Sequence, residues 1–204
     1  MTDFIRKFKA LHIILLAAVL TTIGFAAMGA KGCMAENSAR KNGSLVTTQL
    51  QADDFELIAF KPVDGGWRTT DTDPQMTYTV NGSFTSIYME MDSQLYPGDV
   101  ILYYTNPGDE SWSVQKMIFL VPDGDNPSCY RGSMPLQTVD SIRIDPTSVG
   151  GNLLSFGDII INPPQTLADY MDISAHTVLM YMIYTAFLAA ILRFIQEFFT
   201  KSFE

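Results

Sequence analysis

The chain holds few of the residues on which metal sites and nucleophilic catalysis depend. It has two cysteines and two histidines among 204 residues, and the cysteines are not spaced as CxxC. Both histidines, His12 and His176, lie at the edges of apolar segments, which excludes a zinc site built from Cys and His. No histidine lies between them, so a Ser/His/Asp or Cys/His catalytic set is excluded as well. We therefore expect no catalytic residues and no enzyme activity.

Charged residues are also scarce, at 17%, and two long segments nearly lack them. These segments cover residues 10–30 and 176–199, and each reaches the roughly 20 apolar residues that a transmembrane helix requires. Basic residues at their outer ends favour cytoplasmic termini, residues 1–9 and 200–204, with the rest of the chain outside the cytoplasm. The second span has an amphipathic end. A cleaved signal peptide is the alternative for the first segment, although its apolar stretch exceeds the usual length.

Small residues recur at intervals of four in both expected spans. Ala18, Thr22 and Ala26 share one face of the first span, and Ala186 and Ala190 share one face of the second. Small side chains let helix backbones approach closely in lipid, where packing drives association. We expect these faces to pack together within the chain or to hold another subunit. That subunit would be a polytopic membrane protein or a second copy of this chain.

The segment between the spans is strongly acidic. From residue 36 to 172, seven basic residues stand against nineteen acidic ones, a net charge of −12. Such a surface repels phosphate groups, so nucleic acid is excluded as a partner. A segment of roughly 130 residues is long enough for one domain with its own core and short for two.

Short runs rich in β-branched and aromatic residues fill residues 45–165, after a polar stalk at 31–44 and before a connector at 166–175. Turn residues separate the runs and no helical period joins them, which predicts an all-β antiparallel sandwich, jelly-roll-like in type. Asn81-Gly82 predicts a type I′ hairpin. The expected strands cover residues 44–50, 55–61, 76–80, 83–91, 100–105, 114–121, 138–145 and 153–161.

The cysteines and one acidic loop are the candidates for a cross-link and for a metal. Cys33 and Cys129 both face an oxidising compartment in this topology, so they form either one disulfide or two separate thiols. Asp123, Asp125 and Asn126 lie in a stretch rich in turn residues. Their oxygens could hold Ca²⁺, which accepts irregular loops. No other cofactor is expected.

Several motifs of the middle segment resemble a β-sandwich found in bacterial surface-polysaccharide proteins. They are Gly66-Trp67, Asp73-Pro74-Gln75, the strand at 101–104, residues 142–146, and Gly150-Gly151 with the strand at 156–161. The resemblance covers residues 55–162 and implies a carbohydrate-binding, galactose-binding-like module. Such modules often sit beside glycosyltransferases or multi-helix membrane regions. No catalytic domain is attached here, so the resemblance implies a domain type and not a reaction.

Aromatic side chains in this segment are the candidates for glycan binding, because sugar rings stack on them through their C–H faces. We take Trp67, Trp112 and Tyr130 as candidates, together with Arg131; packing in the core is the alternative for each ring. The sequence thus predicts a non-catalytic, membrane-anchored subunit that binds glycan or assists assembly in surface-polysaccharide synthesis or export. Two alternatives stay open. One is a detached part of a glycosyltransferase or a sugar-acting hydrolase, and the other is a protein-binding adaptor.

Overall fold

The structure is a computed structural model that describes residues 10–202 apart from 125, 168 and 172–174. It divides into two compact units, which are described separately. One unit comprises Met1–Met34 and Gln165–Glu204, and the other comprises Ala35–Pro164. The first unit holds most of the two apolar helices, and the second holds the strands together with the end of the first helix.

Both apolar segments of the sequence are helical. Helix α2 covers Ala10–Lys41 and helix α3 covers Ala175–Ser202, and each contains a stretch long and apolar enough to cross a membrane. A short 3-10 helix, η2, lies at Asp169–Met171. Helix α2 extends through most of the segment expected as a stalk and ends before Gly43, whose φ of 78° closes the helix.

The two helices share a polar contact within the first unit. The Tyr181 hydroxyl on α3 donates to the Ala18 carbonyl on α2 at 3.1 Å and lies 3.0 Å from the Thr22 hydroxyl. The Tyr181 ring also lies 6.1 Å from that of Phe25. Two of the predicted packing residues, Ala18 and Thr22, therefore do contact α3. The other three are exposed: Ala26, Ala186 and Ala190.

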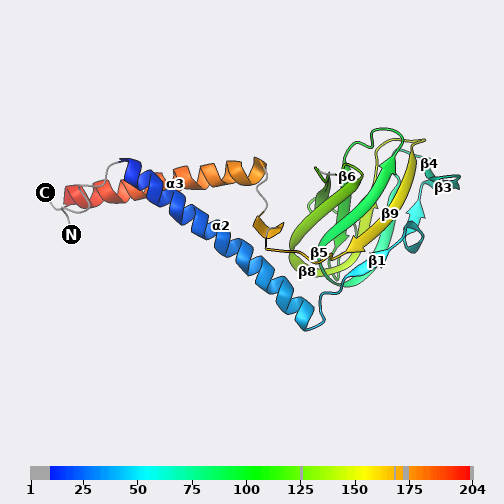
Figure 1. Cartoon of the computed structure of the whole chain (residues 1–204), viewed down its shortest axis with the longest axis horizontal. Coiled ribbons are helices and arrows are strands. Elements are labelled where there is room, and N and C mark those ends of the chain that lie inside the picture. The colour runs from blue at the N-terminus through cyan, green and yellow to red at the C-terminus, as the bar shows by residue number, and fades with distance from the viewer. Residues whose placement is uncertain (1–9, 125, 168, 172–174, 203–204) are drawn as a thin grey trace. The chain divides into compact units, whose positions relative to one another are not determined.

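The second unit is an antiparallel β-sandwich, as the sequence predicts (Figure 1). Its strand order is β3-β4-β9-β5-β8-β6-β7, with β1 beside β9 and β2 beside β5. A 3-10 helix, η1, follows β1 at Ala52–Asp54. The strands are β1 (Thr48–Leu50), β2 (Glu56–Ile58), β3 (Phe60–Val63), β4 (Gly66–Thr69), β5 (Gln75–Ser93), β6 (Val100–Thr105), β7 (Met117–Pro122), β8 (Cys129–Asp145) and β9 (Leu153–Ile161).

The predicted hairpin at Asn81-Gly82 is wrong, because β5 runs through it as one strand of 19 residues. Asn81 does take a left-handed conformation, with φ of 46°, but it forms a bulge where the pairing with β8 shifts between Thr79 and Gly82. A dipeptide that tolerates positive φ serves a bulge as well as a turn. Here β8 continues alongside β5, so the ladder is kept and the chain does not reverse.

Alternation along β5 sorts its side chains between core and surface. Ile87, Met89 and Met91 are buried in the sandwich, with exposed fractions of 2% or less. Successive side chains on a strand point to opposite faces, so Tyr88, Glu90 and Asp92 belong to the outer face. The other large, fully buried side chains come from other positions and strands: Met76, Phe84, Leu102, Val139, Ile142, Ile144, Leu154, Ile159 and Ile161.

A half-buried arginine holds the two ends of the sandwich chain together. Arg40, near the end of α2, donates to the carbonyls of Asn162 and Pro163 at 2.9 and 3.0 Å, just beyond β9. It also donates to the Thr47 hydroxyl at 2.9 Å and pairs with the buried Glu36 at 2.5 Å. We refer to Glu36, Arg40, Thr47 and Asn162 as the Arg40 clamp.

Asn162 extends the clamp into the sheet. Its φ is 52°, a conformation that asparagine tolerates better than most residues, and it is buried. Its side-chain oxygen accepts from the Thr85 N–H at 2.9 Å, and its amide nitrogen donates to the carbonyls of Val46 and Ser83 at 3.1 and 2.9 Å. The clamp thus fixes where the chain enters and leaves the sandwich.

Candidate functional site

The outer face of β5 carries two carboxylates, Glu90 and Asp92, near the end of the strand. We call this the polar end of β5, and it lies far from the Arg40 clamp. Here β5 runs between β8 and β9, with Glu90 opposite Cys129 and Asp92 opposite Ser155. Phe156 on β9 precedes Asn162, the residue after this strand, by six positions, which corresponds to about 20 Å of extended chain. The polar end is therefore well separated from the point where the chain enters and leaves the sandwich.

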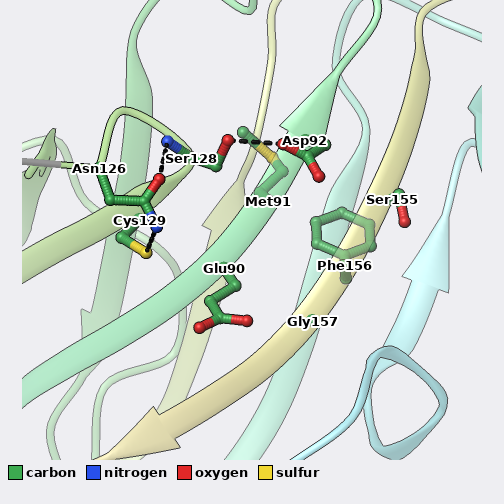
Figure 2. Close-up of a pocket in the computed structure, with 9 residues that line it drawn as sticks. All are labelled: Glu90, Met91, Asp92, Asn126, Ser128, Cys129, Ser155, Phe156 and Gly157. Atoms are coloured by element: carbon green, nitrogen blue, oxygen red, sulfur yellow. Dashed lines mark hydrogen bonds between the residues drawn. The ribbon is translucent and has the colours of Figure 1, made fainter.

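A cavity of about 360 Å³ lies at this end and is open to solvent (Figure 2). We refer to it as the Glu90 pocket. Two carboxylates, an amide, two hydroxyls, a thiol and one aromatic ring line it, and no lining side chain is basic. Its residues are Glu90, Met91 and Asp92 from β5, Asn126, Ser128 and Cys129 from the β7–β8 loop and the start of β8, and Ser155, Phe156 and Gly157 from β9.

Glu90 lies across a glycine of the neighbouring strand. A Cβ atom added at Gly157 would lie 2.5 Å from Glu90 Oε2 and 2.9 Å from Glu90 Cβ. Glycine at this position thus gives the carboxylate its room. The Tyr88 hydroxyl donates to the other oxygen, Glu90 Oε1, at 2.7 Å. Glu90 is therefore placed by one strand neighbour and one hydrogen bond.

The β7–β8 loop forms the opposite wall and is tied to the pocket by side chains (Figure 2). The Ser128 hydroxyl donates to Asp92 Oδ1 at 2.5 Å. Asn126 donates from Nδ2 to the Cys129 sulfur at 2.9 Å, and its Oδ1 accepts from the Ser128 N–H at 3.2 Å. These bonds hold the loop against β5 and keep the wall in place.

Tyr88 links the thiol and the carboxylate below the loop. Its pKa is raised above the usual value by hydrogen bonds to Cys129, 2.9 Å away, and to Glu90, and further by burial of the hydroxyl. The phenol therefore stays protonated at neutral pH and acts as a neutral donor to Glu90. Arg131, the next cation on β8, lies 5.5 Å above the Tyr88 ring and pairs with Asp123 at 3.1 Å.

The four glycan-binding candidates of the sequence lie elsewhere. Trp67 is half-buried on β4 and packs against the core, and Tyr130 is buried at the start of β8. Trp112 is half-buried in the segment between β6 and β7. Arg131 is exposed beside the pocket, and none of these four lines it.

One pattern in the sequence does indicate the pocket, and it consists of acidic residues, not aromatic ones. In Met-Glu-Met-Asp, residues 89–92, acidic residues alternate with apolar ones, which indicates a strand with both carboxylates on its outer face. The partners of these carboxylates come from β8 and β9, tens of residues away along the chain.

The cysteine pair and the calcium loop both stay predictions. Cys33 and Cys129 are free thiols in this structure and belong to different units, so their pairing is not tested. The Cys129 thiol is buried against Tyr88 and Asn126. Asp125 lies outside the described residues, and within the described part of the chain no three Asp, Glu, His or Cys side chains group as metal ligands. Calcium binding in this loop stays a prediction.

No protein-family model matches the chain, and no curated protein matches it. Its fold is similar to that of solved carbohydrate-binding modules. A low-affinity xylan-binding module, CBM86, from Roseburia intestinalis is 14% identical with a TM-score of 0.38, covering 58% of this chain and 96% of the module. A β-1,3-glucan-binding CBM6 from Bacillus halodurans is 11% identical with a TM-score of 0.35, covering 57% and 96%. A module of Cellvibrio mixtus lichenase 5A in complex with cellotriose is 16% identical with a TM-score of 0.32, covering 59% and 100%.

These likenesses concern the arrangement of strands alone. At such identities they carry no residue from one binding site to another. The function of this chain therefore rests on the chemistry of its own side chains.

Proposed function

We propose that the chain is a non-catalytic glycan-binding subunit, anchored in a membrane by α2 and α3, and that the Glu90 pocket is its sugar site. The observation that carries the proposal is the pocket itself. It places carboxylates, hydroxyls and an aromatic ring around one open cavity. Sugar hydroxyls donate to carboxylates and exchange hydrogen bonds with serine, and the C–H face of a sugar ring stacks on an aromatic ring. Phe156, which is half-buried and packs against the core, would supply that ring through its exposed part.

Hydrolysis of a bound sugar is the alternative that the two carboxylates raise. Glu90 and Asp92 are two residues apart on the outer face of β5, about 7 Å along the strand, and inverting glycosidases use carboxyl groups at about this separation. We expect binding without turnover. Incubating the full chain with oligosaccharides and analysing the products checks this, and the release of shorter sugars would favour the hydrolase.

The two apolar helices support a membrane anchor, since both have the length and apolar composition of membrane spans. A role in surface-polysaccharide synthesis or export is the finer part of the proposal. Protease added to intact cells should remove the sandwich and leave terminal tags protected. A terminal tag cut from outside would contradict this orientation.

The sugar site is tested by removing its ring from the full chain. The protein should be placed in nanodiscs of zwitterionic lipid, because sugar-based detergents would compete for the pocket. Phe156→Leu keeps an apolar side chain against the neighbouring Phe60 ring, 6.4 Å away, but removes the stacking face. We expect about tenfold weaker binding of oligosaccharides, since stacking on one aromatic ring contributes about 1–3 kcal/mol by analogy with base stacking.

The matched control is Phe119→Leu, which removes an exposed ring on β7 outside the pocket. This variant should bind as the wild type does. Trp112→Ala tests the candidate that the sequence favoured, and a loss confined to it would move the site to the segment between β6 and β7. If no oligosaccharide binds at millimolar concentration, the protein-binding adaptor becomes the better reading.

A further inference from the structure

The Glu90 pocket is negative and carries no counter-charge of its own. Glu90 and Asp92 belong to one face of β5, about 7 Å apart along the strand. One oxygen of each accepts a hydrogen bond from a neutral donor, the Tyr88 hydroxyl for Glu90 and the Ser128 hydroxyl for Asp92. Neutral donors hold a carboxylate in position without cancelling its charge. Each carboxylate therefore has a second oxygen that these two bonds do not use and that can accept a hydrogen bond from a ligand.

Nearby cations are already paired. None of the nine residues that line the pocket is basic. Arg131, which follows on the same outer face, pairs with Asp123 at 3.1 Å and lies over the Tyr88 ring. The rest of the segment adds to the field, with nineteen acidic against seven basic residues between positions 36 and 172. An anionic sugar would enter this pocket against like charge, whereas an ammonium group would supply the missing partner.

We propose that the Glu90 pocket selects glycans that carry free amino groups, such as chains of glucosamine, over their N-acetylated forms and over uronic acids. This inference rests on the proposed function and deepens it. The ammonium group pairs with the available oxygens of Glu90 and Asp92 while the sugar ring lies against Phe156. An N-acetyl group removes the charge and adds bulk at the same atom. A uronic acid brings a carboxylate next to two others.

The test compares three oligosaccharides on the full chain in zwitterionic nanodiscs. The probes are a glucosamine hexasaccharide, its fully N-acetylated form and a uronic acid hexasaccharide. Exposed ion pairs contribute modestly, so we expect the amino form to bind about five- to tenfold more tightly than the acetylated form at low salt. Salt screens exposed charges, so this preference should shrink as ionic strength rises. The uronic acid form should bind most weakly.

Two variants assign the preference to this pocket. Glu90→Gln with Asp92→Asn keeps both acceptor oxygens and removes both charges, and the preference for the amino form should disappear. Asp99→Asn with Asp140→Asn removes two exposed charges outside the pocket and should leave the preference intact. Ser155→Lys changes one exposed residue of the pocket wall and adds a positive charge, so it should weaken binding of the amino form most. This variant tests the inference even if the double variant fails to fold.

The outcomes separate the inference from the function beneath it. Equal binding of the amino and acetylated forms overturns charge selection and leaves the glycan site standing. A preference that survives in both the Glu90/Asp92 and Ser155 variants places the selecting charges elsewhere and also overturns the inference. Absence of binding to every oligosaccharide overturns the proposed function, and the inference falls with it.

Discussion

Replacing Arg40 by alanine should destabilise the sandwich more than any single surface change. The guanidinium donates to Asn162, Pro163 and Thr47 and pairs with Glu36, whose side chain is 3% exposed. Removal of one partner from a buried pair leaves the other charge unpaired, which costs roughly 3–5 kcal/mol. The Arg40 side chain is itself 21% exposed, so we take the lower end, about 3 kcal/mol. That is a large share of the 5–15 kcal/mol typical of a domain.

The assay follows urea unfolding of the full chain in nanodiscs by tryptophan fluorescence. Both tryptophans, Trp67 and Trp112, lie in the sandwich unit, so the signal reports that unit and not the helices. Arg68→Ala is the matched control, because Arg68 is exposed and donates to the Gly151 carbonyl at 3.0 Å. We expect this control to lose no more than about 1 kcal/mol.

A second variant separates the cost of leaving the Glu36 charge unpaired from the cost of losing the hydrogen bonds of Arg40. Arg40→Ala with Glu36→Ala removes both partners, so no buried carboxylate is left unpaired, and about half of the lost stability should return. A loss below about 1 kcal/mol in Arg40→Ala would show that water solvates Glu36 well enough to replace the guanidinium. The clamp would then be an accessory contact, and the reasoning about its burial would be wrong.

Three further changes test other parts of the structure. Gly157→Ala should destabilise by about 1–3 kcal/mol, because its Cβ meets the neighbouring carboxylate, whereas Gly124→Ala, with open space around it, should have little effect. Tyr88→Phe should reduce the pH dependence of the free energy of unfolding above pH 10.0. The pKa of Tyr88 is raised in the folded state, so its proton stabilises the fold below pH 10.0, and that stabilisation is lost as the pH rises further. Ala26→Leu with Ala190→Leu, both exposed on the helix pair, should shift detergent-extracted protein from a larger assembly to a smaller one, and an unchanged size would exclude association through these faces.

Local patterns predicted the elements of this fold, because each element depends on neighbours in the sequence. The apolar runs gave both helices, and β6 and β9 have the bounds that alternation and turn residues indicated. The long strands were harder. A dipeptide such as Asn81-Gly82 permits both a turn and a bulge, and the choice depends on whether β8 continues alongside β5. That partner lies about sixty residues away in the sequence.

The segment expected as a stalk, residues 31–44, also depends on contacts that are distant in the sequence, because most of it is helical. Gly and Asn suggested a linker, yet residues after Lys31 favour helix, and Glu36 and Arg40 form an i,i+4 pair. What fixes this last turn is the pairing of Arg40 with carbonyls beyond β9, more than a hundred residues away in the chain. Such a contact has no local signature.

Aromatic residues alone do not locate the candidate site. A small sandwich also uses large rings to fill its core: Tyr130 is buried there, and Trp67 and Phe156 are partly buried against it. Acidic residues on an outer face contribute nothing to that core, and Glu90 takes its room from a glycine on the next strand. Polar residues that a fold accommodates without needing them for packing are the stronger pointer to function, and here they gather beside Phe156.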